Sequence, residues 1–307
     1  MTAVVGGARV DPVLGFYGPH SVMWRINREA LLLGAGPAAL LLQVAHPLIA
    51  AGVAQHSDFS TDPFGRLRRT LATTLDMVFG DGPTAEHAVR RLNRVHAGVR
   101  GPSGEEATRL TGVGSYRALD PELLLWVQAT LIVTSVQAYR RWVGEVTDPE
   151  TEVFWQEARS VGVRMGIPLH VSPPDWRALM AYWDEMLAPD GPVQVTTEAR
   201  AMAPMLVRAP LPLAPGWAVD ALALPALSLL PPRLREAYGI PWGPGRTRAA
   251  GLIEHVVRAW SSVVPTTLRS MPQARAADRR VRRAMSGMGA LVHASAAPTT
   301  SGGYDTR

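Results

Sequence analysis

Residues 120–143 read DPELLLWVQATLIVTSVQAYRRWV, and the segment predicts one long helix. Asp120 suits the N-cap, and Pro121 suits the first helical position, because the N–H that proline lacks has no partner there. Apolar residues occupy nearly every side of this helix rather than one stripe, as expected of a helix surrounded by other elements. The segment therefore predicts a central, buried helix that ends at about Val143, before Gly144.

The flanking segments predict further helices. Asp62-Pro63 and Asp148-Pro149 repeat the Asp-Pro start, and the first of these helices is expected to end at Phe79, before Gly80. The next helix, from about Thr84, is expected to bury Ala88, Leu92, Val95 and Val99, which recur at helical spacing. Further helices are expected at 150–165, 175–187, 197–208, 217–229, 246–263 and 274–290, and 193–197 reads as a short extended segment.

The pattern as a whole predicts an all-α protein. No repeat and no Gly/Ser-rich linker divides the chain, so residues 1–293 are expected to form a single globular multi-helix domain. Residues 294–307 are small and polar and are expected to be a disordered tail.

Composition excludes several classes of protein. The 307 residues are 47% hydrophobic and 19% charged, which is typical of a globular chain and not of a disordered one. There is no cysteine, and all 31 basic residues are arginine, so cysteine and lysine chemistry are both excluded. The net charge of +5 is mild, and no nucleic-acid-reading motif accompanies it, so nucleic acid is not expected as a partner.

The longest apolar stretch is Ala30–Ala54, ALLLGAGPAALLLQVAHPLIAAGVA. Its length would cross a bilayer, but Pro37, Gln43, His46 and Pro47 interrupt it. It therefore predicts a buried core helix with a break near Pro47 and no stable membrane span. Because no secretory signal is evident, a cytoplasmic location is expected, with peripheral membrane contact left open.

Two short motifs suggest cofactor chemistry. Gly34–Ala39 (GAGPAA) fits the G-x-G-x-x-A fingerprint of flavin-binding and dinucleotide-binding domains, but the required preceding strand is missing, so close helix packing by small residues is favoured. His56-Ser57-Asp58 fits the H-x-D half of a 2-His-1-carboxylate iron site. A capping or buried polar role for His56 and Asp58 is favoured over a metal site.

His96, Arg66 and Thr70 form a second set of candidates. His96 lies at the edge of the apolar stripe of its helix, where a neutral imidazole suits a haem ligand, although a hydrogen-bonded interior histidine is the commoner case. Arg66 and Thr70 are four residues apart and share a helix face. An arginine beside a buried stripe pairs with a carboxylate or receives an anionic ligand such as a propionate.

Together these residues resemble the latex-clearing-protein (rubber oxygenase)/MpaB oxygenase family over about residues 15–245. The matching stretches are Trp24–Glu29 (WRINRE), Gln43–Pro47 (QVAHP), Ala51–Ser57 (AGVAQHS), Asp62–Thr70 (DPFGRLRRT), Phe79-Gly80, Val95–Gly101 (VHAGVRG), Asp120–Leu131 (DPELLLWVQATL), Leu229–Pro232 (LLPP) and Arg235–Gly239 (REAYG).

The resemblance implies an all-helical, globin-like core that binds b-type haem. It also implies that the R-x-x-x-T motif of the family falls on Arg66 and Thr70, beside the distal face, and the axial histidine on His96. The rubber-cleaving members insert O2 across a carbon–carbon double bond. Two positions differ: the distal lysine of the rubber oxygenases is matched by Arg69, and a histidine that many relatives carry is matched by Gln128.

The resulting prediction is a haem b-dependent oxygenase acting with O2 on an apolar or aromatic small molecule. Arg66 and Thr70 are the expected catalytic residues. The expected cofactor-binding residues are Arg66, Arg69, Thr70, His96 and Gln128, with His96 as the iron ligand and His46 and His56 as secondary candidates. The alternatives are a non-catalytic helical binding protein for a lipid-like ligand and a flavoprotein built on Gly34–Ala39. The oligomeric state is not predicted.

Overall fold

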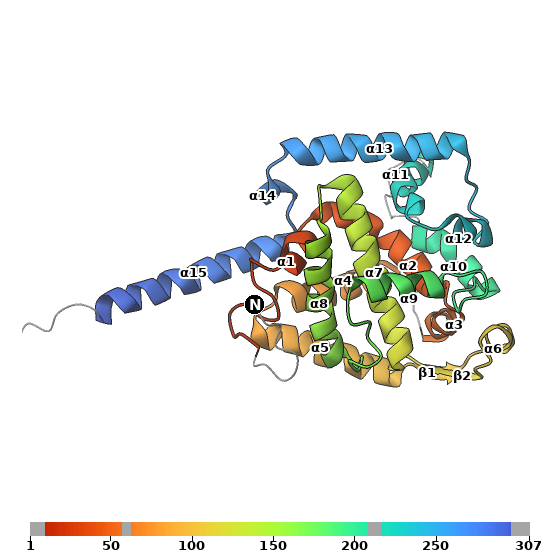
Figure 1. Cartoon of the computed structure of the whole chain (residues 1–307), viewed down its shortest axis with the longest axis horizontal. Helices are drawn as coiled ribbons and strands as arrows, with labels where there is room; N and C mark the ends of the chain where they lie inside the picture. Colours follow the sequence, from red (N-terminus) through yellow and green to blue (C-terminus); the bar gives the residue numbers. More distant parts are fainter. Residues whose placement is uncertain (1–9, 57–62, 208–215, 296–307) are drawn as a thin grey trace, which may run out of the picture.

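The computed structural model describes the backbone of residues 10–56, 63–207 and 216–295, and the side chains of 10–56, 68–207 and 219–286. Within these ranges the chain is helical apart from one small hairpin, as predicted (Figure 1). The first half contains α1 (Val22–Asn27), the 3-10 helix η1 (Ala30–Ala35), α2 (Gly36–Val44), α3 (Pro47–His56), α4 (Pro63–Phe79), α5 (Gly82–Gly98), β1 (Arg100–Pro102), α6 (Glu105–Thr111) and β2 (Ser115–Arg117).

The second half begins with the long central helix. Its elements are α7 (Pro121–Trp142), α8 (Asp148–Met165), α9 (Trp176–Met186), α10 (Thr197–Val207), α11 (Gly216–Ser228), α12 (Pro232–Ala237), α13 (Pro244–Val263), α14 (Thr266–Arg269) and α15 (Pro272–Ser295). A helix of fewer than two turns, or a strand of three residues, has too little periodicity to be recognised in a sequence. For this reason we did not predict α6, α12, α14 or the β1–β2 hairpin.

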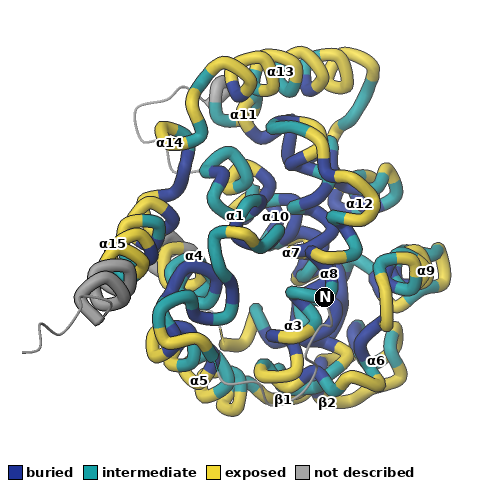
Figure 2. Tube along the Cα trace, turned by 60° about the vertical axis from the view of Figure 1, so that its left-hand side comes forward, coloured by how far each residue is buried: buried dark blue, intermediate teal, exposed yellow. Residues whose placement is uncertain are grey.

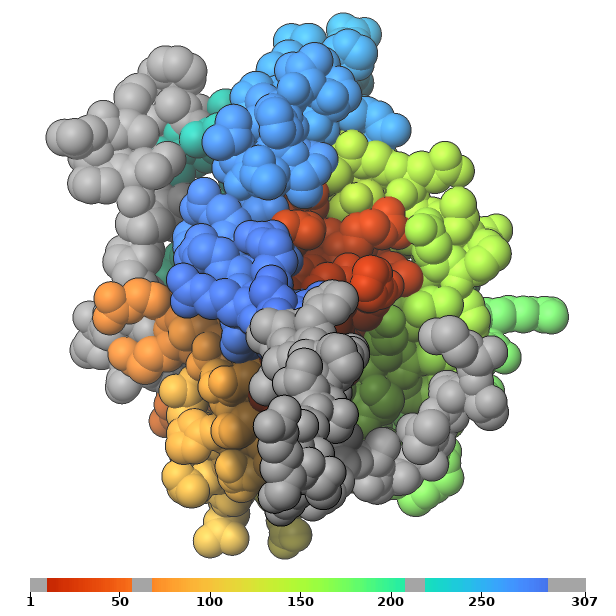
Figure 3. All heavy atoms as spheres, turned by 90° about the vertical axis from the view of Figure 1, so that its left-hand side faces the viewer, coloured from red at the N-terminus to blue at the C-terminus, as the bar shows by residue number. Residues whose placement is uncertain are grey.

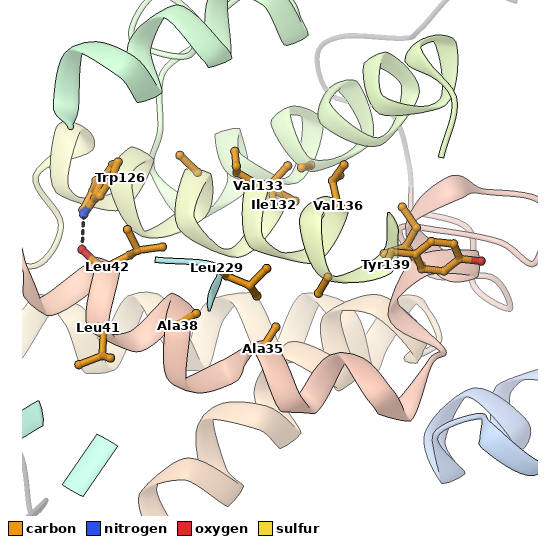
Figure 4. Close-up of a cluster of buried hydrophobic side chains, with 14 of the residues drawn as sticks. Ala35, Ala38, Leu41, Leu42, Trp126, Ile132, Val133, Val136, Tyr139 and Leu229 are labelled. Carbon is orange, nitrogen blue, oxygen red and sulfur yellow. Dashed lines mark hydrogen bonds between the residues drawn. The ribbon is translucent and has the colours of Figure 1, made fainter. Parts of the chain in front are cut away.

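The predicted central helix is confirmed as α7. It packs against α2, α8, α13 and η1, and Trp126, Ala129 and Ala138 are fully buried. Figure 4 shows the small residues Ala35 and Ala38 on the side of η1 and α2 that faces α7. The small side chains of Ala35 and Ala38 allow the two backbones to approach closely, which is the helix-packing role favoured for the Gly34–Ala39 motif. Because 3-10 helix η1 precedes Gly36 instead of a strand, the dinucleotide fingerprint lacks its structural context.

The apolar stretch breaks at Pro47, as predicted. Among the described residues no single helix is long and apolar enough to cross a membrane, and the segments Ala30–Val44 and Pro47–His56 meet at an angle of 106°. Proline lacks the backbone N–H and disfavours a helical conformation at the residue before it, so Pro47 favours a break and begins α3. Carbonyls at the end of α2 accept from side chains: Trp126 Nε1 donates to Leu42 O at 3.0 Å (Figure 4). The Tyr238 hydroxyl donates to Leu41 O at 2.6 Å.

Three local predictions are wrong. The N-cap of α8 is Thr147 rather than Asp148, because Thr147 forms a reciprocal capping box with Glu150. The extended segment predicted for 193–197 is one residue too long, because 193–196 form the loop before α10 and Thr197 begins the helix. In α5, Val95 is 60% exposed, and the buried positions are Ala85, Ala88 and Val89, since neighbouring elements cover only the N-terminal half of that helix (Figure 2). Of the predicted tail, Ser295 and the residue before it end α15, and 296–307 lie outside the described residues.

Two ion pairs connect the C-terminal helices to the residues that directly follow α1. Arg269 Nη1 donates to Glu29 Oε2 at 2.7 Å, and Arg28 Nη2 donates to Asp278 Oδ2 at 2.7 Å. Glu29 is 3% exposed, and burial raises the pKa of its carboxyl, although Arg269 and Arg28 oppose the rise. Met271 N–H also donates to Arg28 O at 2.8 Å. These contacts hold α14 and the start of α15 against the N-terminal segment.

Replacing Glu29 with glutamine is expected to lower the free energy of unfolding by about 2 kcal/mol, because Arg269 then lacks its counter-ion in a largely buried site. Guanidinium denaturation measures the change. The matched control is Glu86→Gln, which removes an exposed pair with Arg90 and is expected to cost less than about 0.5 kcal/mol. Equal losses in the two variants would contradict a structural role for the Glu29 contact.

Candidate functional site

His46 lies at the bend between α2 and α3 and is 7% exposed. Its carbonyl accepts the N–H groups of Ile49 and Ala50, and its Nδ1 accepts the N–H of Leu48 at 3.3 Å, so the residue caps α3. Burial lowers the pKa of His46 to about 4, and the ring is therefore neutral at pH 7.

The Nδ1 contact assigns the proton of His46 to Nε2. A histidine that binds a metal through one ring nitrogen carries its proton on the other, which usually donates to a nearby acceptor. In His46 the nitrogen that accepts from Leu48 cannot hold that proton. His46 thus fits a hydrogen-bond donor through Nε2 better than an iron ligand.

His56 lies at the end of α3 and is attached to the β1–β2 hairpin, whose strands are antiparallel with Gly101 opposite Tyr116. His56 Nε2 lies 3.1 Å from Arg100 O, and its ring meets that of Tyr116 edge-on at 6.2 Å. These contacts give the exposed ring a structural role. Asp58, the aspartate of the H-x-D motif, lies outside the described residues.

The facial-triad interpretation of His56 is not tested, because Asp58 lies outside the described residues. Within the described parts of the chain, no group of three or more His, Asp or Glu side chains is arranged to hold a metal ion. A haem iron needs only one or two side-chain ligands, so this finding does not bear on a haem site.

Helices α4 and α5 form an antiparallel pair that carries the other predicted residues. Arg91 on α5 donates to Thr73 Oγ1 on α4 at 2.5 Å and lies 3.9 Å from Asp76 Oδ2. Residues before Thr73 therefore lie opposite residues after Arg91, which brings Thr70 and His96 to the same end of the pair. Arg69 and Thr70 are exposed there, and the side chain of Arg66 lies outside the described part of the structure.

His96 occupies the last turn of α5. Its side chain is partly buried, and its Nδ1 is shielded from solvent. One turn earlier, Asn93 Nδ2 donates to Arg164 O at 3.0 Å, which attaches this end of α5 to the end of α8. His96 therefore lies beyond the buried residues of α5, which are all in the first half of the helix.

Gln128 projects from α7 toward α8. Its Nε2 donates to Ala158 O at 2.8 Å, and a Cβ on Gly162 would lie 3.0 Å from both Nε2 and Oε1. The amide therefore fills the space that glycine leaves on α8. Its Oε1 is buried and has no hydrogen-bond partner in the described structure.

The candidate residues contact different elements of the fold. His46 belongs to the α2–α3 bend, His56 to the hairpin, and Gln128 to the α7–α8 interface. Arg69, Thr70 and His96 lie on the α4–α5 pair, as does the backbone of Arg66, whose side chain lies outside the described residues. The structure thus separates the seven predicted residues into one group at the α4–α5 end and several residues with structural contacts.

The sequence interpretation missed two polar contacts of the core. Gln43 Nε2 donates to Thr130 Oγ1 at 3.1 Å and joins α2 to α7. Glu157 of α8 accepts the N–H groups of Met23 at 2.7 Å and Val22 at 3.3 Å at the start of α1, and burial raises the pKa of its carboxyl. Gln43 and Thr130 both lie within the sequence motifs quoted above, so the motifs could have marked them as residues of interest. No local pattern marks Glu157.

Comparison with known proteins gives one family and two relatives. The family described as "ER-bound oxygenase mpaB/B'/Rubber oxygenase, catalytic domain" matches residues 23–263. Two uncharacterized proteins, Mb2261 of Mycobacterium bovis and Rv2237 of Mycobacterium tuberculosis, are each 28% identical over 244 residues, covering 75% of this chain and 89% of theirs. No solved structure gives a significant match, so the globin-like core stays a prediction.

Proposed function

Because the chain belongs to the ER-bound oxygenase mpaB/B'/rubber oxygenase family, we propose that it is a haem b-dependent oxygenase with His96 as the proximal iron ligand. The family implies O2 and a small-molecule substrate, and we propose that this substrate is apolar or aromatic. The observation that supports the proposal is the antiparallel pairing of α4 with α5, through which the half of α4 that carries Arg69 and Thr70 runs beside the half of α5 that carries His96.

The residues present fit such a group. A haem b site needs one neutral imidazole and cations that can receive the propionates. His96 would supply the imidazole. Arg66 and Arg69 would receive propionates, because arginine stays protonated and binds carboxylates through a planar fork. When bound, haem b supplies the redox-active iron that reacts with O2.

The other predicted residues would act around this group. Thr70 carries a hydroxyl that would donate a hydrogen bond on the distal side, beside Arg66. His46 would contribute a neutral N–H donor through Nε2, since its Nδ1 is taken by Leu48. Gln128 would be a positioning residue that fixes α7 against α8, because its Nε2 is held by Ala158.

The test is the absorption spectrum of the purified protein, expressed with added haem precursor, followed by a pyridine haemochrome assay. The proposal expects a Soret band and about one b haem per chain. A colourless protein despite the haem supply would contradict it and favour a binding protein for a lipid-like ligand. A flavin spectrum would contradict it in favour of the Gly34–Ala39 motif.

A further inference from the structure

Helix α13 (Pro244–Val263) is oriented with an apolar stripe toward solvent. Leu252, Val256, Trp260 and Val263 are 65%, 57%, 46% and 77% exposed. Taking about 100° per residue, these four side chains lie within about 80° of one another around the helix. The helix forms the upper edge of the molecule in Figure 1 and Figure 3, and its trace is largely exposed in Figure 2.

The opposite side of α13 faces the protein, where Val257 packs against the core beside small and polar residues. Ala250 and Ser261 are its buried residues, and the Ser261 hydroxyl donates to Trp142 O at 2.9 Å. Glu254 accepts from the Ser228 hydroxyl at 2.6 Å and lies 3.6 Å from Arg141 Nη1. A surface helix normally buries its apolar side and exposes its polar side. In α13 the hydrogen bonds to α7 and α11 fix the reverse orientation.

Exposed apolar stripes of this kind mark surfaces that bind something else. We propose that α13 binds the surface of an anionic lipid bilayer, lying in the plane of the interface. Trp260 supports this assignment, because its ring suits the boundary between lipid chains and headgroups. The inference does not rest on the proposed oxygenase activity.

The charges beside the stripe select an anionic partner. Arg246, Arg248 and His255 are exposed on α13, whereas Glu254 is the sole acidic residue of this helix, is 17% exposed and is already engaged. Arginines near an interfacial helix are attracted to anionic headgroups. If a second copy packed on the same stripe, the arginines of the two helices would approach each other, and α13 has no exposed acidic residue to balance their charge. A lipid surface is therefore favoured over self-association.

Vesicle flotation of the full chain tests the proposal. The protein is expected to float with vesicles of phosphatidylcholine and 30% phosphatidylglycerol, and to bind pure phosphatidylcholine at least tenfold more weakly. Leu252→Asp combined with Val256→Asp is expected to reduce binding to the anionic vesicles at least tenfold. Both positions are exposed, so circular dichroism and the Tm should stay close to those of the parent protein.

The matched control is Leu110→Asp on α6, which is 40% exposed at the end of the molecule away from α13 (Figure 1). This variant is expected to float like the parent. The proposal is overturned if the parent does not float, or if the α13 variant floats as well as the control. It is equally overturned if sedimentation velocity shows a dimer that the α13 variant dissociates, because the stripe would then bind a second copy.

Discussion

Replacing His96 with alanine is expected to reduce haem occupancy at least tenfold without unfolding the protein. His96 is the proposed proximal ligand, and an alanine leaves the iron without its protein bond on that side. The ring is only partly buried at the end of α5, so its removal creates little cavity and should change the free energy of unfolding by less than about 1 kcal/mol. The haemochrome assay and the Tm of the same preparation measure the two effects separately.

Two variants serve as controls for His96→Ala. His56→Ala removes a histidine that contacts the carbonyl of Arg100 and the ring of Tyr116, and it is expected to retain haem. His46→Asn keeps a cap at the start of α3 and is expected to retain most of the haem. Full occupancy in His96→Ala, or loss of haem in His56→Ala instead, would remove His96 from the proposed site.

The fold was predictable where one local pattern agrees with the tertiary packing. The segment 120–143 is apolar on all sides, so every orientation that buries it gives the same central helix. Pro47 breaks the preceding apolar stretch for a purely local reason, the missing N–H. The exposure of Val95 was not predictable in the same way, because it depends on which side of the second half of α5 the neighbouring helices leave uncovered.

The candidate site was predictable as a set of residues but not as an arrangement. The family motifs gave Arg66, Thr70 and His96, and the antiparallel pairing of α4 with α5 explains why Thr70 and His96 reach one end. The contact of Gln128 depends on Gly162, which is 34 residues further along the chain, and no periodicity links them. The tautomer of His46 depends on one backbone N–H at the bend, which sequence spacing does not reveal.

The stability of the protein is expected to depend on pH through His46. In the folded state the pKa of His46 is about 4, so the ring stays neutral until the pH falls to that value. In the unfolded chain the ring takes up a proton near its ordinary pKa of 6.5. Between these two values the unfolded state holds more protons, so the free energy of unfolding falls as the pH falls. The loss approaches about 3 kcal/mol, at roughly 1.4 kcal/mol per pKa unit, and it levels off below pH 4.

The variant His46→Asn separates this effect from the other titrating groups. Asparagine does not titrate, and its side-chain oxygen can accept the Leu48 N–H as an N-cap, so α3 should keep its start. Denaturant unfolding of both proteins at pH 7.5, 5.5 and 4.5 gives the difference in the free energy of unfolding at each pH. That difference should shift in favour of the variant by about 3 kcal/mol between pH 7.5 and 4.5. A constant difference would mean that His46 has the same pKa in the folded and unfolded states, and the residue would then no longer fit a buried, neutral N–H donor.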